Sequence, residues 1–150
     1  MNIDKLRQEI ADDEGCVHSI YLDHLGLESV GIGHLIVESD PEYGQPIGTD
    51  ISDERVRQLF SLDIAVCIED CKILYPTWDS MSDELHHILA NLMFNMGRPR
   101  MSLFKKFIAA IEAGDFAESA DQLVDSRYYR QVTNRAQRLV NRLDLLAVPV

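Results

Sequence analysis

Residues 82–97 read SDELHHILANLMFNMG. Ser82 and the two acidic residues after it are typical of a helix N-terminus, and Gly97 follows the last apolar residue as a helix stop. Leu, Ile and Met side chains recur at three- and four-residue spacing, and Phe94 makes a second face apolar. A helix that is apolar on more than one side belongs in the middle of a core. The pattern therefore predicts a central helix that other elements surround.

A longer helix is predicted on its N-terminal side, over residues 53–74. Ser52 provides the cap, and Pro76 ends the helix because the residue before a proline avoids the helical region. The apolar stripe of this helix is interrupted by Asp63. A carboxylate on an apolar stripe needs a charged or hydrogen-bonding partner, so we expect one elsewhere in the chain.

The segment 16–35 differs in character, because it is rich in β-branched and aromatic residues and carries turn residues, DHLG, at positions 23–26. It predicts a hairpin or small sheet. In residues 30–33, VGIG, apolar residues and glycines alternate, which predicts a strand with both glycines on one face. A short amphipathic helix over residues 3–11 precedes the sheet and ends near Gly15, and residues 38–50 form a loop.

Three shorter helices are predicted after Gly97, at about 102–113, 115–126 and 134–146. The expected fold class is therefore α+β and mostly helical. It has two lobes: a small N-terminal β lobe and a C-terminal helical lobe, joined by the helix over 53–74. A length of 150 residues with 46% hydrophobic content suits one domain over residues 1–150.

Composition excludes several classes of protein. The net charge of −11 argues against nucleic-acid binding, and no apolar run approaches the roughly 20 residues that span a bilayer, so membrane insertion is not expected. The polar N-terminus lacks the pattern of a secretory signal, which predicts a protein first confined to the cytosol. The three cysteines do not suit a disulfide framework. Cys67 and Cys71 share a helix face, and we expect buried thiols rather than metal ligands.

The charge is unevenly distributed along the chain. Residues 1–97 contain nineteen acidic and five basic side chains, whereas residues 98–150 contain six acidic and nine basic ones. One interpretation is a solvated surface that varies by chance. The other is that the C-terminal part carries a face for an anionic ligand, to which Arg98, Arg100 or Lys105 would contribute.

Three residues near the start form a candidate catalytic set. Glu14 lies where a helix gives way to the β region, Asp23 lies at a turn, and Ser29 lies on the returning strand. Glycoside hydrolysis needs an acid that protonates the leaving oxygen and a second carboxylate that activates water or stabilises positive charge, and a hydroxyl can help to hold the water. The pair is not diagnostic alone, because 25 acidic residues provide many such pairs by chance.

The surrounding motifs are more specific. They are DEG at 13–15, IYLD at 20–23, GIGHL at 31–35, NLMFNMG at 91–97, SRYY at 126–129 and NRA at 134–136. In this order, over about residues 10–143, the chain resembles bacteriophage lysozymes of the T-even type. The resemblance implies the two-lobed lysozyme fold and hydrolysis of the β-1,4 bond between N-acetylmuramic acid and N-acetylglucosamine in peptidoglycan. It implies no metal or organic cofactor.

The resemblance also implies roles for single residues. Glu14 matches the general acid and Asp23 the second carboxylate. Ser29 falls where the family usually has Thr, so the hydroxyl is kept and the methyl is lost. Because this hydroxyl can hold a water against Asp23, we expect inversion at the anomeric carbon.

Other matching residues lie around this set. Gly33, Leu35, Asn95 and Phe94 match substrate-cleft positions, although Phe94 also fits a core. His34 matches a structural residue whose partner is Asp63, and we expect an ion pair rather than catalysis. Arg135 matches a residue that pairs with Glu14 and orients it; the alternative is an exposed helical arginine.

The leading hypothesis for the biological role is a monomeric phage endolysin. It would stay in the host cytoplasm before lysis and would need a holin or another membrane lesion to reach peptidoglycan in the periplasm. One alternative is the same hydrolase in a phage tail or as an antibacterial effector. Another is a non-catalytic sugar-binding module on a lysozyme fold, against which Glu14, Asp23 and Ser29 count.

Overall fold

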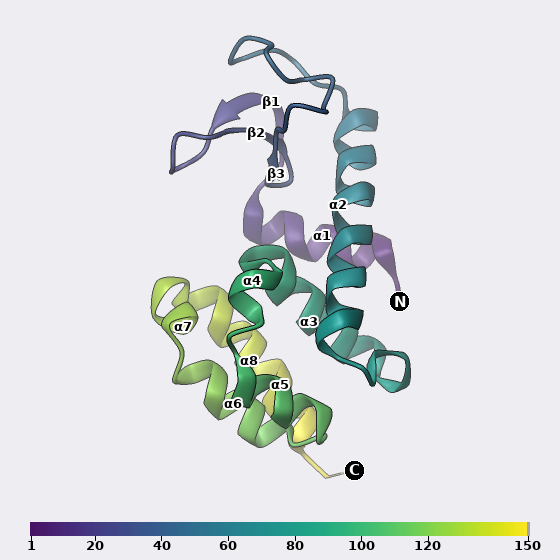
Figure 1. Cartoon of the computed structure of the whole chain (residues 1–150), viewed down its shortest axis with the longest axis vertical. Helices are drawn as coiled ribbons and strands as arrows, with labels where there is room; N and C mark the ends of the chain where they lie inside the picture. The colour runs from purple at the N-terminus through teal and green to yellow at the C-terminus, as the bar shows by residue number, and fades with distance from the viewer. Residues whose placement is uncertain (150) are drawn as a thin grey trace. The chain divides into compact units, whose positions relative to one another are not determined.

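The computed structural model describes residues 1–149 as a mostly helical chain with one small antiparallel sheet near its start, so the predicted α+β class is confirmed (Figure 1). The elements in chain order are α1 (Ile3–Glu14), β1 (Val17–Leu22), β2 (Glu28–Gly31), β3 (His34–Leu35), α2 (Asp53–Leu74), the 3-10 helix η1 (Trp78–Ser80), α3 (Asp83–Met96), α4 (Arg98–Met101), α5 (Lys105–Glu112), α6 (Phe116–Val124), α7 (Arg127–Gln131) and α8 (Thr133–Ala147).

The chain divides into two compact units. The N-terminal unit comprises Asn2–Val66, and the C-terminal unit comprises Met1 and the chain from Cys67 onward. The boundary falls within α2, which has the bounds that the sequence predicts for the long helix and begins where the Ser52 hydroxyl accepts a hydrogen bond from the Arg55 amide at 3.1 Å. The prediction of a single domain over residues 1–150 stays a prediction.

The sheet of the N-terminal unit has the strand order β1-β2-β3 with antiparallel neighbours. Ser29 on the central strand lies opposite Tyr21 on one side and opposite Leu35 on the other. The sheet packs on the first half of α2 through a buried cluster of Ile20, Val30, Ile36 and Leu59, with Ile51 against it. Burying these apolar side chains contributes roughly 1.5–3 kcal/mol each and fixes which face of the sheet is free to carry polar groups.

The prediction of a continuous strand over residues 30–33 is wrong. The chain turns after β2, because Gly31 and Gly33 both have positive φ angles, of 67° and 65°. Only glycine adopts this region without strain. A Cβ at Gly31 would also lie 3.1 Å from Cγ1 of Val56 on α2. The glycines therefore reverse the chain against α2, and this turn starts β3 at His34.

The C-terminal unit is built around α3, as its apolar pattern predicts. Leu85, Ile88, Leu89 and Leu92 are buried, and the helix begins at the Ser82 cap. Among the described residues, α3 packs against α4 and α8, and α6 packs against α5 and α8, as the green and yellow helices of Figure 1 show.

The predicted buried thiols are confirmed in the same unit. Sγ of Cys67 donates to the carbonyl of Ala90 at 3.3 Å, and Sγ of Cys71 donates to that of Leu89 at 3.8 Å. Both cysteines therefore attach α2 to the backbone of α3.

Two short helices were not predicted, and the predicted helix over 102–113 begins later, at Lys105. Pro99 starts α4, and the Ser102 hydroxyl donates to the Pro99 carbonyl at 2.8 Å, which closes the turn before α5 can begin. The Ser126 side chain caps α7 by accepting from the Tyr129 amide at 3.0 Å. Helices of one turn have no hydrophobic periodicity of their own, so the sequence pattern does not reveal them.

Candidate active site

Glu14 is the last residue of α1. Gly15 follows with φ of 81°, and its N–H donates to the Ala11 carbonyl at 2.8 Å, which ends the helix. The chain then enters β1 at Val17. Glu14 is therefore held at the junction of a helix and a sheet, and its side chain is partly exposed. This is the position that the sequence predicts for the candidate acid.

Asp23 lies in the turn that follows β1. One carboxylate oxygen, Oδ1, accepts hydrogen bonds from the backbone N–H groups of Leu25 at 2.8 Å and Leu27 at 2.9 Å. The Leu27 amide lowers the pKa of Asp23 most, and the Leu25 amide and the charge of His24 act in the same direction against a partial desolvation. The turn therefore fixes an ionised carboxylate, and among residues 1–149 its second oxygen, Oδ2, has no hydrogen-bond partner.

Ser29 and Asp23 are linked through Leu27. Ser29 is buried, with 4% of the residue exposed, and its hydroxyl donates to the Leu27 carbonyl in a long bond of 3.4 Å. The same carbonyl accepts from the Asp23 amide at 2.9 Å. One turn residue thus holds both the carboxylate and the hydroxyl, which brings these two predicted site residues together. Because a bond of 3.4 Å is weak, the hydroxyl can turn to another acceptor at little cost.

Tyr21 is a residue of this site that the sequence analysis missed. It lies opposite Ser29 on the neighbouring strand, so the two side chains are on one face of the sheet. Burial raises the pKa of Tyr21, and the negative charges of Glu14 and Asp23 raise it further. The phenol therefore stays protonated within the field of both candidate catalytic carboxylates. Its position two residues before Asp23 on a strand was the signal available in the sequence.

His34 forms the predicted pair with Asp63, and it has a second partner that was not predicted. Nδ1 of His34 lies 2.7 Å from Oδ2 of Asp63, and Nε2 lies 2.8 Å from Oδ2 of Asp40. The Asp63 hydrogen bond is the largest cause that raises the pKa of His34, to about 9, and Asp40 adds to it, while burial opposes both. Asp40 also accepts from the Val37 amide at 2.9 Å, so its interaction with His34 fastens the loop to the sheet.

Gly33 and Leu35 are both exposed beside this pair. Leu35 lies directly opposite Ser29 in the register of β2 and β3. Both positions are open to a ligand, and their role in substrate binding stays a prediction.

The remaining predicted site residues lie in the C-terminal unit. Phe94 and Asn95 are on α3 and are partly exposed. Arg135 on α8 is buried, and its Nε donates to Oδ1 of the buried Asn91 at 3.0 Å. An exposed helical arginine at this position is therefore excluded. The orientation of Glu14 by Arg135, and sugar binding by Phe94 and Asn95, stay predictions.

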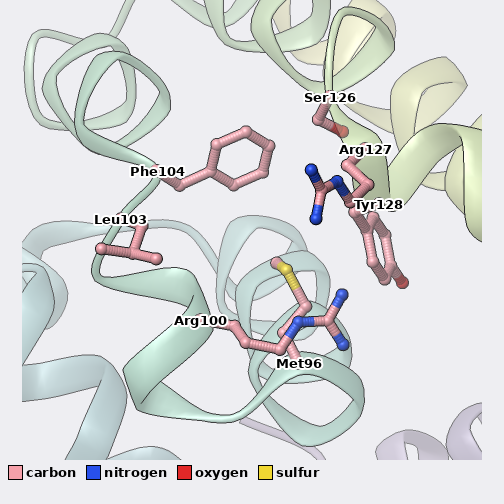
Figure 2. Close-up of a pocket in the computed structure, with 7 residues that line it drawn as sticks. All are labelled: Met96, Arg100, Leu103, Phe104, Ser126, Arg127 and Tyr128. Carbon is pink, nitrogen blue, oxygen red and sulfur yellow. The ribbon is translucent and has the colours of Figure 1, made fainter.

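The C-terminal unit also contains a pocket with a volume of about 500 Å³. Figure 2 shows its lining residues: Met96, Arg100, Leu103, Phe104, Ser126, Arg127 and Tyr128. They come from α3, α4, α7 and the segments beside them, so residues about thirty positions apart line one space. The lining contains two arginines and no carboxylate, which distinguishes it from most of the surface of this acidic chain.

The basic residues that one of the two interpretations assigns to an anionic ligand differ in their surroundings. Arg98 forms an ion pair with Asp70 at 3.3 Å, so its charge is already compensated. Arg100 donates through Nη2 to the amide oxygen of Gln131 at 2.9 Å, which orients the guanidinium without neutralising it. Lys105 is exposed and does not line the pocket. Of these three residues, Arg100 is the one placed to bind an anion in the pocket.

Within residues 1–149 no three His, Cys, Asp or Glu side chains come together as ligands for a metal ion. Over the same residues, none of the helices combines the length and apolar character needed to cross a bilayer.

Comparison with known proteins gives consistent matches. The sequence model of the phage lysozyme family matches residues 11–144. The probable T4-type lysozyme 2 of Dictyostelium discoideum is 28% identical, with 93% of each chain covered, and the probable T4-type lysozyme 1 of the same organism is 24% identical with the same coverage. The pre-baseplate central spike protein of Enterobacteria phage T4 is 28% identical over 85% of this chain and 25% of its own length.

Proposed function

The chain belongs to the phage lysozyme family and is a lysozyme, a glycoside hydrolase, and from this premise we propose how its residues act and in which setting. We infer that it cleaves the β-1,4 bond between N-acetylmuramic acid and N-acetylglucosamine in bacterial peptidoglycan with inversion. Glu14 is the general acid, Asp23 is the general base, and Ser29 helps to hold the attacking water.

The arrangement of the Asp23 turn is the observation that carries this proposal. Two backbone N–H groups bind one oxygen of the carboxylate and lower its pKa, so Asp23 is ionised when substrate arrives. The other oxygen is left for a water molecule. Ser29 reaches the same turn through the Leu27 carbonyl. A fixed, ionised carboxylate with a hydroxyl beside it is suited to general-base activation of water.

The proposed reaction is a single displacement. Glu14 donates its proton to the glycosidic oxygen while the bond from that oxygen to the anomeric carbon breaks. Water attacks the anomeric carbon from the opposite face, and Asp23 accepts the proton that water loses. Such a displacement requires the two carboxyl groups to lie roughly 6.5–9.5 Å apart around the substrate. The Tyr21 phenol stays protonated through these steps, within the field of both carboxylates.

We propose a phage endolysin as the biological setting. In that role the protein waits in the host cytoplasm and reaches the peptidoglycan after a holin, or another lesion, opens the membrane. Similarity to the spike protein of phage T4 favours one alternative, a wall hydrolase carried in a phage tail. Expression in a bacterial host with and without a co-expressed holin tests the endolysin role. An endolysin lyses the culture only with the holin, whereas an unchanged culture in both cases opposes the endolysin role.

The catalytic proposal is tested on peptidoglycan gels with purified protein. Glu14→Gln removes the acid and keeps the shape of the side chain, so lytic activity should fall by about 10²–10⁴-fold while the far-UV circular dichroism stays unchanged. Glu38→Gln, an exposed carboxylate in the loop after β3, is the matched control and should leave activity unchanged. Retention of more than about a tenth of the activity by Glu14→Gln would remove Glu14 from the role of acid.

Proton NMR of the first product tests the stereochemistry. Inversion gives the α-anomer of the new reducing end before mutarotation. A β-anomer at the earliest time points, or a covalent glycosyl adduct on Asp23, would show a retaining reaction instead.

A further inference from the structure

We propose that the pocket of the C-terminal unit is a carboxylate-binding subsite, through which this lysozyme prefers peptidoglycan whose stem peptides carry free carboxylates over peptidoglycan whose stems are amidated. The inference rests on the proposed function, because it concerns the peptide that branches from the muramic acid. It assigns specificity to Arg100 and Arg127.

The two arginines that line the pocket are not neutralised. Arginines elsewhere in the described chain form ion pairs with Asp or Glu, among them Arg7, Arg55, Arg57, Arg98 and Arg142. Over residues 1–149, Arg100 binds only the neutral amide oxygen of Gln131, and Arg127 has no carboxylate partner. A protein of net charge −11 has many carboxylates that could pair with them. Two uncompensated guanidinium groups that face one space form a site of positive potential.

The geometry of the pocket favours an anion that is presented by a small organic chain. In Figure 2 Arg127 enters the pocket from one side, and Arg100 and Met96 enter from the other. Leu103, Phe104 and Tyr128 complete the wall with apolar surface. A volume of about 500 Å³ is sufficient for a peptide of a few residues. The apolar wall suits the methyl and methylene groups of such a peptide, and the guanidinium groups suit its carboxylates.

The chemistry of the peptidoglycan stem matches this combination. The stem peptide carries small aliphatic residues, a D-glutamate and often a diaminopimelate, whose carboxylates are free in some bacteria and amidated in others. A guanidinium binds a carboxylate through charge-assisted, often bidentate hydrogen bonds. An amide is uncharged and offers one oxygen in place of two, so both the charge interaction and the second hydrogen bond are lost. The pocket therefore discriminates between the two kinds of stem.

Binding of synthetic stem peptides tests the inference without catalysis. The probes are L-alanyl-γ-D-glutamyl-meso-diaminopimelate and the same tripeptide with its carboxylates amidated, and each is titrated into the full-length protein by NMR or calorimetry. We expect the acid form to bind about tenfold more tightly than the amide form. Arg100→Gln and Arg127→Gln should each reduce this ratio about threefold or more, and the double substitution should bring it close to one.

Arg130→Gln is the matched control. Arg130 is an exposed arginine on α7, three residues from Arg127, and it does not line the pocket. Its substitution removes the same charge and should leave the ratio unchanged. Equal binding of the acid and amide peptides would overturn the proposal, as would an equal effect of Arg130→Gln. Tighter binding of a glycerol-phosphate polymer than of the acid peptide would assign the pocket to a different wall component and would also overturn it.

Hydrolysis assays separate this inference from the proposed function. The rates of the wild type on amidated and unamidated peptidoglycan give a ratio that should change in the same way as the binding ratio. Glu14→Gln should abolish hydrolysis of both substrates and leave peptide binding unchanged. Selective binding without any hydrolysis by the wild type would contradict the proposed function alone, whereas hydrolysis without selective binding would contradict the inference alone.

Discussion

Substitution of His34 by Gln should make the stability of the protein less dependent on pH. His34 lies between Asp63 on α2 and Asp40 in the loop, at 2.7 and 2.8 Å, and its side chain is only 12% exposed. Both carboxylates favour the protonated imidazole, and the pKa rises from the ordinary 6.5 to about 9. The protonated side chain therefore binds the loop and α2 to the sheet within the N-terminal unit.

The size and the direction of the effect follow from this rise. At about 1.36 kcal/mol for each factor of ten in proton affinity, a rise from 6.5 to about 9 corresponds to roughly 3 kcal/mol of folding free energy. Because the pKa is raised in the folded state, this stabilisation is complete below pH 6.5. It is lost as the pH rises through the window from 6.5 to about 9, where the folded protein also releases the proton.

Urea unfolding of the wild type and of His34→Gln on both sides of this window measures the effect. The difference in the free energy of unfolding between the two proteins should shrink by roughly 3 kcal/mol between the acidic and the basic end. Taking the difference cancels the contributions of the other titrating groups. Asp63→Asn should cause a smaller loss on the acidic side, because Asp40 still binds the imidazolium.

His24→Gln is the control, because His24 is an exposed histidine in the turn after β1. Its free energy of unfolding should differ from that of the wild type by much less than about 3 kcal/mol at every pH. A difference in the free energy of unfolding between wild type and His34→Gln that stays constant from acidic to basic pH would refute the reasoning. A difference that falls with a midpoint below pH 6.5 would also refute it.

Two further predictions concern the turn that carries Asp23. Ser29→Ala should lower kcat about tenfold. It should change the free energy of unfolding by less than about 1 kcal/mol, because the bond of the hydroxyl to the Leu27 carbonyl is long. Ser29→Thr should match or exceed the native rate, and equal rates for all three proteins in a turbidity assay would exclude a role of the hydroxyl in holding water. Tyr21→Phe should lower kcat by up to roughly tenfold, because the protonated phenol shares the sheet face of Ser29 and lies within the field of both carboxylates. An unchanged kcat would place the hydroxyl outside the reaction.

Much of the fold could be predicted from local patterns in the sequence. The helix over 53–74 has its predicted bounds, because a Ser cap, an apolar period and a following Pro act within a few residues of one another. The same is true of α3 between Ser82 and Gly97. That Asp63 needs a partner could also be predicted, since a carboxylate on an apolar stripe is costly unless it is paired, whereas the choice of His34 was implied by the resemblance to phage lysozymes. In each case the interaction that decides the structure is local or is demanded by burial.

The tertiary structure alone decided the features that depend on contacts between distant residues. The two glycines at 31 and 33 alternate as a strand would, but both have positive φ angles and the chain turns there, where a Cβ at Gly31 would meet Val56 of α2. Asp40 reaches His34 because the loop folds back, and no pattern in the loop predicts that. Arg100 on α4 and Arg127 on α7 line one pocket, although each helix is too short to have a period of its own. Burial patterns repeat along the chain and can be predicted from it, whereas a cluster of polar groups depends on how the packed elements meet.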